Sequence, residues 1–431
     1  MVNFDSAPAT FAELLAASLG ADAAENGRLV RDVYGRLAFV TRRPLDEKAN
    51  ALSRRAAEAL GAYAVSASRI LVSLADDEPA YKVWAGEPSI GIPAGADTEF
   101  RMIDRRVAEG EWLMPAEPIA QGPGRLIFHS IKGGVGRSTA LAITAADLAA
   151  RGYNVLVIDM DLEAPGQGTL LLPPGAVPKF GVVDWFAAVA AGADAERLLH
   201  DMVGQSAFTS GRAVVDVVPA AGGNPGDYIS KLARAYMPGS SGQDYAGFGY
   251  PRKARHLVKQ LLALRAYDAV LIDARAGLHE TSGALLLGLG ARTLLFGVDT
   301  DQTFEDYRIM FGAFRQALDP IIGGEDFRPH LKMVHAKAPR DVAERAPFQE
   351  RSWNLWSETL YDIDPGSAEA IDPYVFDLGD DSAPHYPLEI VGDETYARFN
   401  PRSQTYAMSS DAYAPVFGGF LAGVREMLGL S

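Results

Sequence analysis

The sequence contains no cysteine, which excludes disulfide bonds, thiolate-bound zinc, iron–sulfur clusters and a cysteine nucleophile. It also contains no apolar run as long as a membrane-spanning helix. The first residues, M-V-N-F-D-S-A-P, lack the basic and apolar regions of a signal peptide. From these absences we expect a cytoplasmic protein.

Basic charge is scarce as well. The chain has 40 Lys and Arg against 55 Asp and Glu, a formal net charge of −15, so its composition does not favour a surface that coats nucleic acid. The seven histidines show neither H-E-x-x-H nor H-x-x-E-H spacing, and no G-x-S-x-G segment occurs. These absences disfavour a histidine metal site and a hydrolase built on a serine elbow. With 431 residues, the chain is long enough for a large core and two domains.

The most informative segment that is present runs from Lys132 to Thr139 and reads K-G-G-V-G-R-S-T. It nearly matches the phosphate-binding loop G-x-x-x-x-G-K-[ST], with Arg137 in the place of lysine and Lys132 in the place of the first glycine. Its glycines permit positive φ angles, so successive N–H groups can point at phosphate oxygens. We therefore predict a nucleotide site rather than an ordinary glycine turn. The predicted nucleotide contacts are Gly133, Gly134, Val135, Gly136, Arg137, Ser138 and Thr139.

The segments around the loop strengthen this prediction. Residues 125–131 are typical of a strand, and residues 138–150 are typical of a helix, which Gly152 ends. Residues 154–161 are typical of a second buried strand. A strand, a glycine-rich loop, a helix and a strand in this order form the βαβ unit of a nucleotide-binding fold.

Carboxylates stand at the ends of two predicted strands. Asp159 and Asp161 end the second strand and share one of its faces. Asp273 ends a later strand, V-L-I-D, which has the form of a Walker B segment. Because ligands bind beyond the carboxyl ends of such strands, we predict Mg²⁺ contacts from Ser138, Asp159 and Asp273; the alternative is that the first two aspartates only cap their strand. No N-K-x-D or T-K-x-D segment follows the predicted strand 330–336, so ATP is favoured over GTP.

Beyond the loop, apolar strands alternate with helices, which favours a doubly wound, mostly parallel α/β sheet. The predicted strands are 125–131, 154–160, 213–219, 268–274, 292–299, 330–336 and 386–391, and the predicted helices include 182–190, 252–265 and 302–317. We expect residues 222–250 to form a long surface excursion and residues 340–385 to be irregular. One apolar face between Phe417 and Leu428 predicts a helix packed on the sheet, with a membrane-surface helix as the alternative.

The first 122 residues precede this pattern and mix helical and extended segments. Helices are predicted at 11–19 and 46–63, and extended segments at 36–41 and 68–74. We expect a small N-terminal α+β domain over residues 1–122, followed by the nucleotide-binding domain over residues 123–431. The junction between them is rich in proline and glycine, as linkers often are.

The loop, the D-x-D strand and the V-L-I-D strand together resemble the deviant-Walker-A branch of P-loop ATPases, in the SIMIBI class. That branch includes the ParA and MinD partitioning ATPases, whose loop reads K-G-G-x-G-K-[ST]. The resemblance extends over roughly residues 125–430. It is closer still to a bacterial variant subgroup with K-G-G-V-G-R, which then has D-x-D-L-E-A-P-G (Asp159 to Gly166) and G-V-V-D-W (Gly181 to Trp185).

The resemblance implies an ATP-sandwich homodimer in which Lys132 reaches the nucleotide of the partner. It also implies that Asp161 activates water, that Ser138 and Asp273 lie beside Mg²⁺, and that Thr139 contacts phosphate. The catalytic residues on this basis are Lys132, Arg137 and Asp161. Arg137 departs from the lysine of the family, and arginine keeps the charge but is larger and planar. We therefore expect this replacement to affect the rate of ATP hydrolysis more than the binding of the nucleotide.

Our primary hypothesis is a Mg-ATP-binding, slowly hydrolysing ATPase that acts as a nucleotide-dependent dimerisation switch for an unidentified protein partner. One alternative is a hydrolysis-deficient, nucleotide-sensing interaction module, with Arg137 as the inactivating change. Another is a partitioning-type ATPase that associates with DNA or membrane. The acidity of the chain and the single basic residue of its C-terminal helix, Arg425, disfavour that last alternative.

Overall fold

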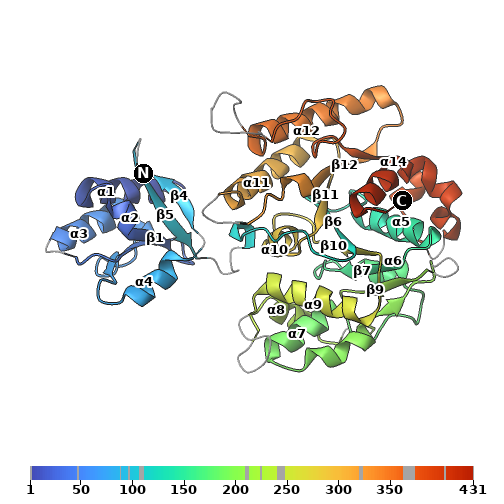
Figure 1. Cartoon of the computed structure of the whole chain (residues 1–431), viewed down its shortest axis with the longest axis horizontal. Coiled ribbons are helices and arrows are strands. Elements are labelled where there is room, and N and C mark those ends of the chain that lie inside the picture. The colour runs from blue at the N-terminus through green and yellow to red at the C-terminus, as the bar shows by residue number, and fades with distance from the viewer. Residues whose placement is uncertain are drawn as a thin grey trace. The chain divides into compact units, whose positions relative to one another are not determined.

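The computed structural model contains two compact units. Figure 1 colours the chain by residue number, so that the segments of each unit can be followed. The smaller unit comprises the chain through Met114 and a short segment that begins at Gln316, and the larger unit, which begins at Pro115, contains the remainder. The functional division expected at residues 122 and 123 stays a prediction. The residues that the structure describes are 2–45, 48–87, 89–95, 98–105, 111–208, 213–223, 226–239, 248–319, 324–362, 374–401 and 404–430.

The smaller unit is an α+β fold around a five-stranded sheet in the order β3-β2-β1-β5-β4. Its strands are β1 (Gly27–Arg31), β2 (Leu37–Thr41), β3 (Leu71–Ser73), β4 (Ile90–Pro93) and β5 (Glu99–Asp104), and its helices are α1 (Ala7–Leu19), α2 (Ala23–Asn26), α3 (Lys48–Leu60) and α4 (Glu78–Ala85). The core contains Phe11 of α1 with Phe39 and Phe100, whose rings meet edge to face at 6.0 Å. The predicted helices near residues 11–19 and 46–63 are confirmed, although residues 46 and 47 lie outside the described part.

The larger unit contains an eight-stranded sheet in the order β13-β12-β11-β6-β10-β7-β9-β8. Its strands are β6 (Gly124–Ser130), β7 (Val155–Asp159), β8 (Gly204–Gln205), β9 (Val215–Val218), β10 (Ala269–Asp273), β11 (Arg292–Gly297), β12 (Leu331–Ala338) and β13 (Leu388–Val391). Neighbouring strands are parallel throughout, except for β8 with β9. The predicted mostly parallel α/β sheet is confirmed.

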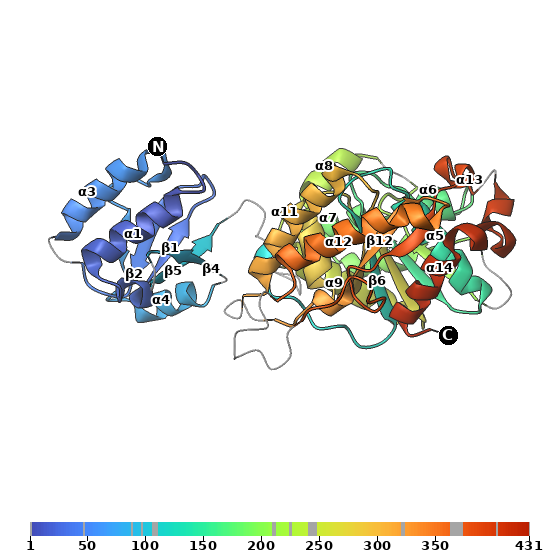
Figure 2. The same ribbon diagram turned by 90° about the horizontal axis from the view of Figure 1, so that it is seen from above.

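Helices cover both faces of this sheet. They are α5 (Arg137–Ala150), α6 (Gln167–Leu171), α7 (Val182–Ala191), α8 (Tyr228–Ala235), α9 (Tyr250–Leu264), α10 (Glu280–Gly288), α11 (Asp301–Ala317), α12 (Ala346–Thr359), α13 (Glu394–Ala397) and α14 (Ser410–Leu428). In Figures 1 and 2, α5 and α14 lie together on one face, and Figure 1 shows α9, α10 and α11 on the other. Strand β6 lies near the middle of the sheet, so the loop that follows it opens between these two layers.

The C-terminal helix packs on the sheet, as predicted. Phe420 and Val424 of α14 are fully buried in the same core cluster as strands β6 and β10 and helix α5. Gly423 lies against Leu388 of β13, which lets the helix approach that strand closely. In the part of the chain that the structure describes, no helix has the length and apolarity needed to cross a membrane.

The expectation that residues 340–385 are irregular was wrong in part, and residues 363–373 lie outside the described part. Residues 340–385 contain the helix α12, because Pro347 lies in its first turn, where a proline is tolerated and does not break the helix. Its buried face then repeats at helical spacing, with Phe348, Ser352, Leu355 and Trp356 inside. Residues 222–250 contain α8 and the first residue of α9, and residues 240–247 lie outside the described part.

Candidate nucleotide-binding site

The glycine-rich loop connects the end of β6 to the start of α5. Gly134 and Gly136 have φ angles of 77° and 97°, values that side chains other than glycine rarely adopt. A Cβ atom added at Gly133, Gly134 or Gly136 would meet no heavy atom within 4 Å, so the loop backbone faces open space. A cavity of about 310 Å³ lies there, lined by residues 133–139, Lys337 and residues 396–399. Its position at the helix N-terminus suits an anion.

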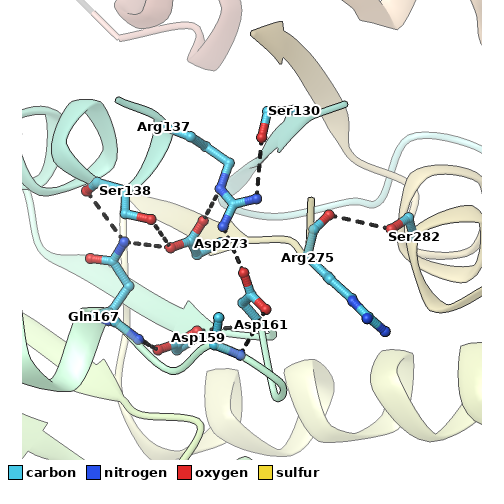
Figure 3. Close-up of polar contacts among 11 residues, drawn as sticks. Ser130, Arg137, Ser138, Asp159, Asp161, Gln167, Asp273, Arg275 and Ser282 are labelled. Carbon is cyan, nitrogen blue, oxygen red and sulfur yellow. Dashed lines mark hydrogen bonds and ion pairs between the residues drawn. The ribbon is translucent and has the colours of Figure 1, made fainter. Parts of the chain in front are cut away.

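Arg137 does not extend into that open space. Its guanidinium Nη2 is 2.8 Å from Asp161 Oδ2, and its Nε is 2.6 Å from Asp273 Oδ1 (Figure 3). The third nitrogen, Nη1, lies 3.4 Å from Ser130 Oγ. Burial favours loss of the proton, but the charges of Asp273 and Asp161 outweigh it and raise the pKa of Arg137. In this structure the loop cation is therefore held by two of the predicted site carboxylates.

Strand order explains why these carboxylates meet. Strand β10 lies between β6 and β7, and Asp273 pairs in register with Asp159. Burial and the neighbouring charge of Asp273 raise the pKa of Asp159 to about 7. Burial also raises the pKa of Asp161, while its ion pair with Arg137 opposes that shift. Arg137 thus pairs with two carboxylates, Asp161 and Asp273, and a third carboxylate, Asp159, lies at the end of the neighbouring strand.

Asp159 binds mainly backbone. Its Oδ2 accepts hydrogen bonds from the N–H groups of Gly166 (2.9 Å) and Gln167 (3.0 Å), and its Oδ1 accepts one from Asp161 (3.2 Å). These bonds order the loop that leads from β7 to α6. The prediction that Asp159 also contacts Mg²⁺ stays a prediction.

Ser138 and Asp273 face each other across the first turn of α5. Ser138 donates from Oγ to Asp273 Oδ2 at 2.9 Å, and Gln167 donates from Nε2 to the same carboxylate oxygen at 2.6 Å (Figure 3). The Gln167 amide also reaches the carbonyl oxygen of Ser138 at 3.3 Å. A hydroxyl and a carboxylate oxygen side by side are ligands of the kind that Mg²⁺ prefers. Among the described residues, however, no cluster of three or more His, Cys, Asp or Glu side chains forms a ready metal site.

Unlike Arg137, Lys132 is not held by contacts with the described residues of the site. It is partly exposed at the start of the loop, and its amino group has no hydrogen-bond or ion-pair partner within the described chain. The structure therefore leaves this lysine available for a group outside its own site. Its role across a dimer interface stays a prediction.

Lys337 belongs to the site although the sequence did not single it out. Its amino group donates to the carbonyl oxygen of Gly134 at 2.8 Å, and its backbone has a positive φ of 58°. It lies near the end of β12, in the segment H-A-K-A that is followed by Pro339. Lys337 also lines a second cavity of about 650 Å³, which shares Gly136 and Tyr396 with the cavity above the loop. The two cavities together offer room for phosphates and for a larger attached group.

A further layer of contacts surrounds the carboxylates. Glu163, in the loop after β7, accepts a hydrogen bond from Arg275 Nη1 at 2.7 Å and another from the Tyr236 hydroxyl. The Tyr228 hydroxyl donates to the carbonyl oxygen of Leu162 at 2.7 Å. The segments after β7 and β10 are thus tied to each other and to helix α8.

The structure brings together most of the residues that the sequence predicted. Arg137, Ser138, Asp159, Asp161 and Asp273 form one network of hydrogen bonds and ion pairs (Figure 3). Gly133, Gly134, Val135, Gly136 and Thr139 line the cavity in front of it. Sequence reasoning missed Gln167, Ser130 and Lys337. The only sequence signal for Lys337 was its position, which matches the lysine of the guanine-reading signature N-K-x-D.

Residues 126–220 match the model of the CobQ/CobB/MinD/ParA nucleotide binding domain family. Among solved structures, pNOB8 ParA bound to nonspecific DNA is 19% identical with a TM-score of 0.42, over 71% of this chain and 99% of that one. The cell division ATPase MinD of Pyrococcus furiosus is 21% identical with a TM-score of 0.41, over 70% and 99%. MinD of Aquifex aeolicus is 14% identical with a TM-score of 0.43, over 72% and 98%. No curated protein matches the chain significantly.

The fold, the loop and the acidic strand ends define a nucleotide-binding α/β domain of the P-loop type. Its matched segment runs from β6 through the phosphate loop, α5 and β7 to β9, and so contains most of the site. Residues 126–220 are thus similar to the nucleotide binding domain of that family.

Proposed function

We propose that this chain is a Mg-ATP-dependent dimerisation switch that hydrolyses ATP slowly and engages a protein partner. The observation that carries the proposal is the open loop at Gly133–Gly136 beside the network of Arg137, Asp161 and Asp273. The loop is shaped to accept phosphates, and the network joins it to the two strands that end in carboxylates. A nucleotide bound at the loop would therefore affect the contacts at the ends of both strands.

The phosphates would lie against the loop N–H groups and the N-terminus of α5, where the helix dipole favours anions. The nucleoside would occupy the adjoining 650 Å³ cavity, a size within the range of small-ligand pockets. Pro339 stands where the guanine-reading signature has its aspartate, so nothing there selects guanine by that route. ATP is therefore the proposed ligand.

Mg²⁺ would be held through Ser138 Oγ and the carboxylate of Asp273. The hydroxyl of Ser138 and the carboxylate of Asp273, whose oxygens are 2.9 Å apart, support a divalent cation at this place. When bound, Mg²⁺ supplies charge neutralisation at the phosphates. The Asp273 oxygen available to Mg²⁺ beside Ser138 would be Oδ2, which also accepts a hydrogen bond from Gln167, while Oδ1 lies 2.6 Å from the Arg137 Nε.

Slow hydrolysis follows from the same pairing. The proposed role of Asp161 is to accept a proton from, or orient, the attacking water, and a carboxylate held by a guanidinium is a weaker base. Arg137 would also have to swing toward the phosphates to stabilise charge there. Both functions require the ion pair of Arg137 with Asp161 to open, which costs free energy in every turnover.

Dimerisation is proposed from Lys132. Its amino group is partly exposed and has no partner within the described chain, so it is free to reach a phosphate bound by a second copy. A cation that contacts nucleotide only across an interface would make association depend on the nucleotide. The dimer would then offer the protein partner a surface that the monomer lacks.

The test combines ATP binding with the measurement of molar mass. Wild type, Lys132→Ala and the control Lys179→Ala, an exposed lysine outside the site, are measured by light scattering without nucleotide and with Mg-ATP. We expect wild type and Lys179→Ala to double in mass with Mg-ATP, while Lys132→Ala binds ATP and stays monomeric. The dimer switch is wrong if wild type stays monomeric with ATP bound, and the nucleotide site is wrong if ATP does not bind.

One observation favours a second candidate, a nucleotide sensor without turnover. The double pairing of Arg137 with Asp161 and Asp273 engages both residues that hydrolysis would need. If the pairing persists with nucleotide bound, binding would change conformation without cleavage. Phosphate release from wild type at the level of an Asp161 variant, with ATP binding and dimerisation intact, would select this candidate.

A further inference from the structure

A third cavity in the larger unit is lined by basic and aromatic side chains. It measures about 370 Å³, and its lining consists of Arg125, Phe248, Arg252, Arg255, His256 and Lys259. Four of these residues come from α9, which Figure 1 shows in yellow, and Arg125 comes from the start of β6. Among the described residues, no acidic side chain lines the cavity. This concentration of cations stands out in a chain with a net charge of −15.

Most of this positive charge lacks a counterion within the described residues. Arg255 pairs with Glu117. Arg252 has only an aromatic neighbour, with its guanidinium carbon 3.7 Å from the centre of the Phe248 ring, and Lys259 is exposed without a carboxylate partner. The three cations Arg125, Arg252 and Lys259 therefore remain for a ligand.

Arg125 is the most informative of the three because it is half-buried. Its Nη1 donates to the carbonyl oxygen of Leu289 at 3.1 Å, while its Nε is buried without a hydrogen-bond partner in the described chain. Burial lowers the pKa of Arg125, and no nearby acid offsets the effect. A buried, unpaired donor on a charged group is costly, which indicates a missing acceptor.

This cavity is separate from the nucleotide site. Arg125 lies at the beginning of β6 and Ser130 at its end, so they are about 17 Å apart along an extended strand. The phosphate loop follows Ser130. The basic cavity therefore lies at the opposite end of the strand, and none of the described residues lines both this cavity and the one above the loop.

We propose that this basic cavity binds a small anion with at least two phosphate groups. Guanidinium groups bind phosphate through paired hydrogen bonds, and Arg125 and Arg252 both contribute one. Two phosphate groups, each with a charge of ~−1.5 to −2, match three unpaired cations. One face of Phe248 is already covered by Arg252, so that face does not offer a stacking surface for a base. The phosphate groups therefore define the class of ligand. They can belong to a free phosphate anion or to a larger compound.

The test uses inorganic pyrophosphate as the probe and calorimetry as the measurement. Because the phosphate loop could also take pyrophosphate, the titration is made in the Gly136→Val background, where a β-branched residue cannot adopt the φ of 97°. A parallel titration uses wild type saturated with ADP, so that the result does not depend on the folding of one variant. Lys259→Glu and Arg252→Glu remove a cation each. The matched control is Arg197→Glu, an exposed arginine elsewhere in the same unit.

We expect pyrophosphate to bind in both backgrounds, and each cavity variant to weaken it at least about tenfold, while Arg197→Glu changes it less than about twofold. Absence of binding in both backgrounds would overturn the proposal, as would equal affinities for the cavity and control variants. A short DNA duplex is titrated in parallel. If the duplex binds in a way that depends on Lys259 and pyrophosphate does not bind, the cavity belongs to a nucleic-acid surface and the small-anion proposal is wrong. None of these outcomes depends on ATP turnover or on dimerisation.

Discussion

The side chains of Arg137 and Asp161, 24 positions apart, form an ion pair of 2.8 Å that joins the phosphate loop to the end of β7. Both side chains are more than nine-tenths buried. The pair forms because β7 lies next but one to β6, with Asp273 of β10 between them. The arginine, which stands where the phosphate-loop motif has lysine, is long enough to contact both acids at once. The planar guanidinium therefore holds the loop to the ends of two strands, and it is also a candidate contact for phosphate.

Asp161→Asn should abolish phosphate release while leaving ATP affinity within about threefold of wild type, because the proposed role of this carboxylate is to act on water and not on the nucleotide. The change also weakens one ion pair, so the free energy of unfolding should fall by roughly 1–3 kcal/mol. Phosphate release and ATP titration on the same sample check both parts. Asp184→Asn, at a carboxylate that pairs with Lys231, is the matched control. Release from Asp161→Asn at the wild-type rate would contradict the role of Asp161.

Arg137→Lys should raise the rate of ATP hydrolysis severalfold. Lysine keeps the positive charge, but a single ammonium group cannot hold Asp161 and Asp273 in the same forked geometry. Both carboxylates would then be released more readily, at a cost of roughly 1–2 kcal/mol in the stability of the nucleotide-free protein. Single-turnover phosphate release measures the effect, and Arg275→Lys, beside Glu163, controls for a general loosening of the region. A rate below wild type with ATP affinity unchanged would show that the arginine itself promotes turnover.

Two kinds of pattern predicted part of the site: the local pattern around the loop, and the positions of acidic residues at the ends of strands. The strand, the glycine loop and the helix from residue 124 to residue 150 follow from local pattern alone. Asp159 and Asp273 were predicted because residues at the carboxyl ends of parallel strands meet at one edge of the sheet. That expectation needs only the type of sheet, and the register of Asp273 with Asp159 bears it out.

The rest of the site depends on contacts that no local pattern encodes. Gln167 reaches Asp273 across 106 positions, and Lys337 reaches Gly134 across 203. Neither side chain has a motif of its own, so only the folded chain brings it to the loop. The pairing of Arg137 was missed for a related reason: the motif assigns that position to phosphate, whereas the buried acids compete for the same charge.

Stability should fall as the pH drops from about 6.5 toward about 4, in part because of His335. Burial lowers the pKa of this imidazole from 6.5 to about 4, and its ring stacks on Phe348 with centres 4.1 Å apart. Between these two values the unfolded chain binds a proton that the folded chain does not, so the stability contributed by neutral His335 is complete above about pH 6.5 and is lost as the pH falls.

Denaturant unfolding at a series of pH values measures this effect. His335→Gln should lower stability by ~1 kcal/mol at neutral pH through the lost stacking, and should flatten the acid side of the profile. His200→Gln, at an exposed histidine, should leave the profile unchanged. An acid slope as steep in His335→Gln as in wild type would assign the pH dependence to other groups.

Lys337 should contribute to ATP binding through its amino group and to stability through its backbone. Its amine anchors the Gly134 carbonyl oxygen and places a cation beside the loop. Lys337→Ala and Lys337→Gly should both weaken ATP binding about three- to tenfold, because each removes that amine. The positive φ of 58° costs most residues roughly 1–2 kcal/mol, so the glycine variant should be more stable than the alanine variant by ~1 kcal/mol. Lys332→Ala, on the same strand but bonded to the carbonyls of Asp381 and Ala383, should leave ATP affinity unchanged. If the glycine variant regains ATP affinity, the backbone angle and not the amine governs the loop, and the assigned role of the side chain is wrong.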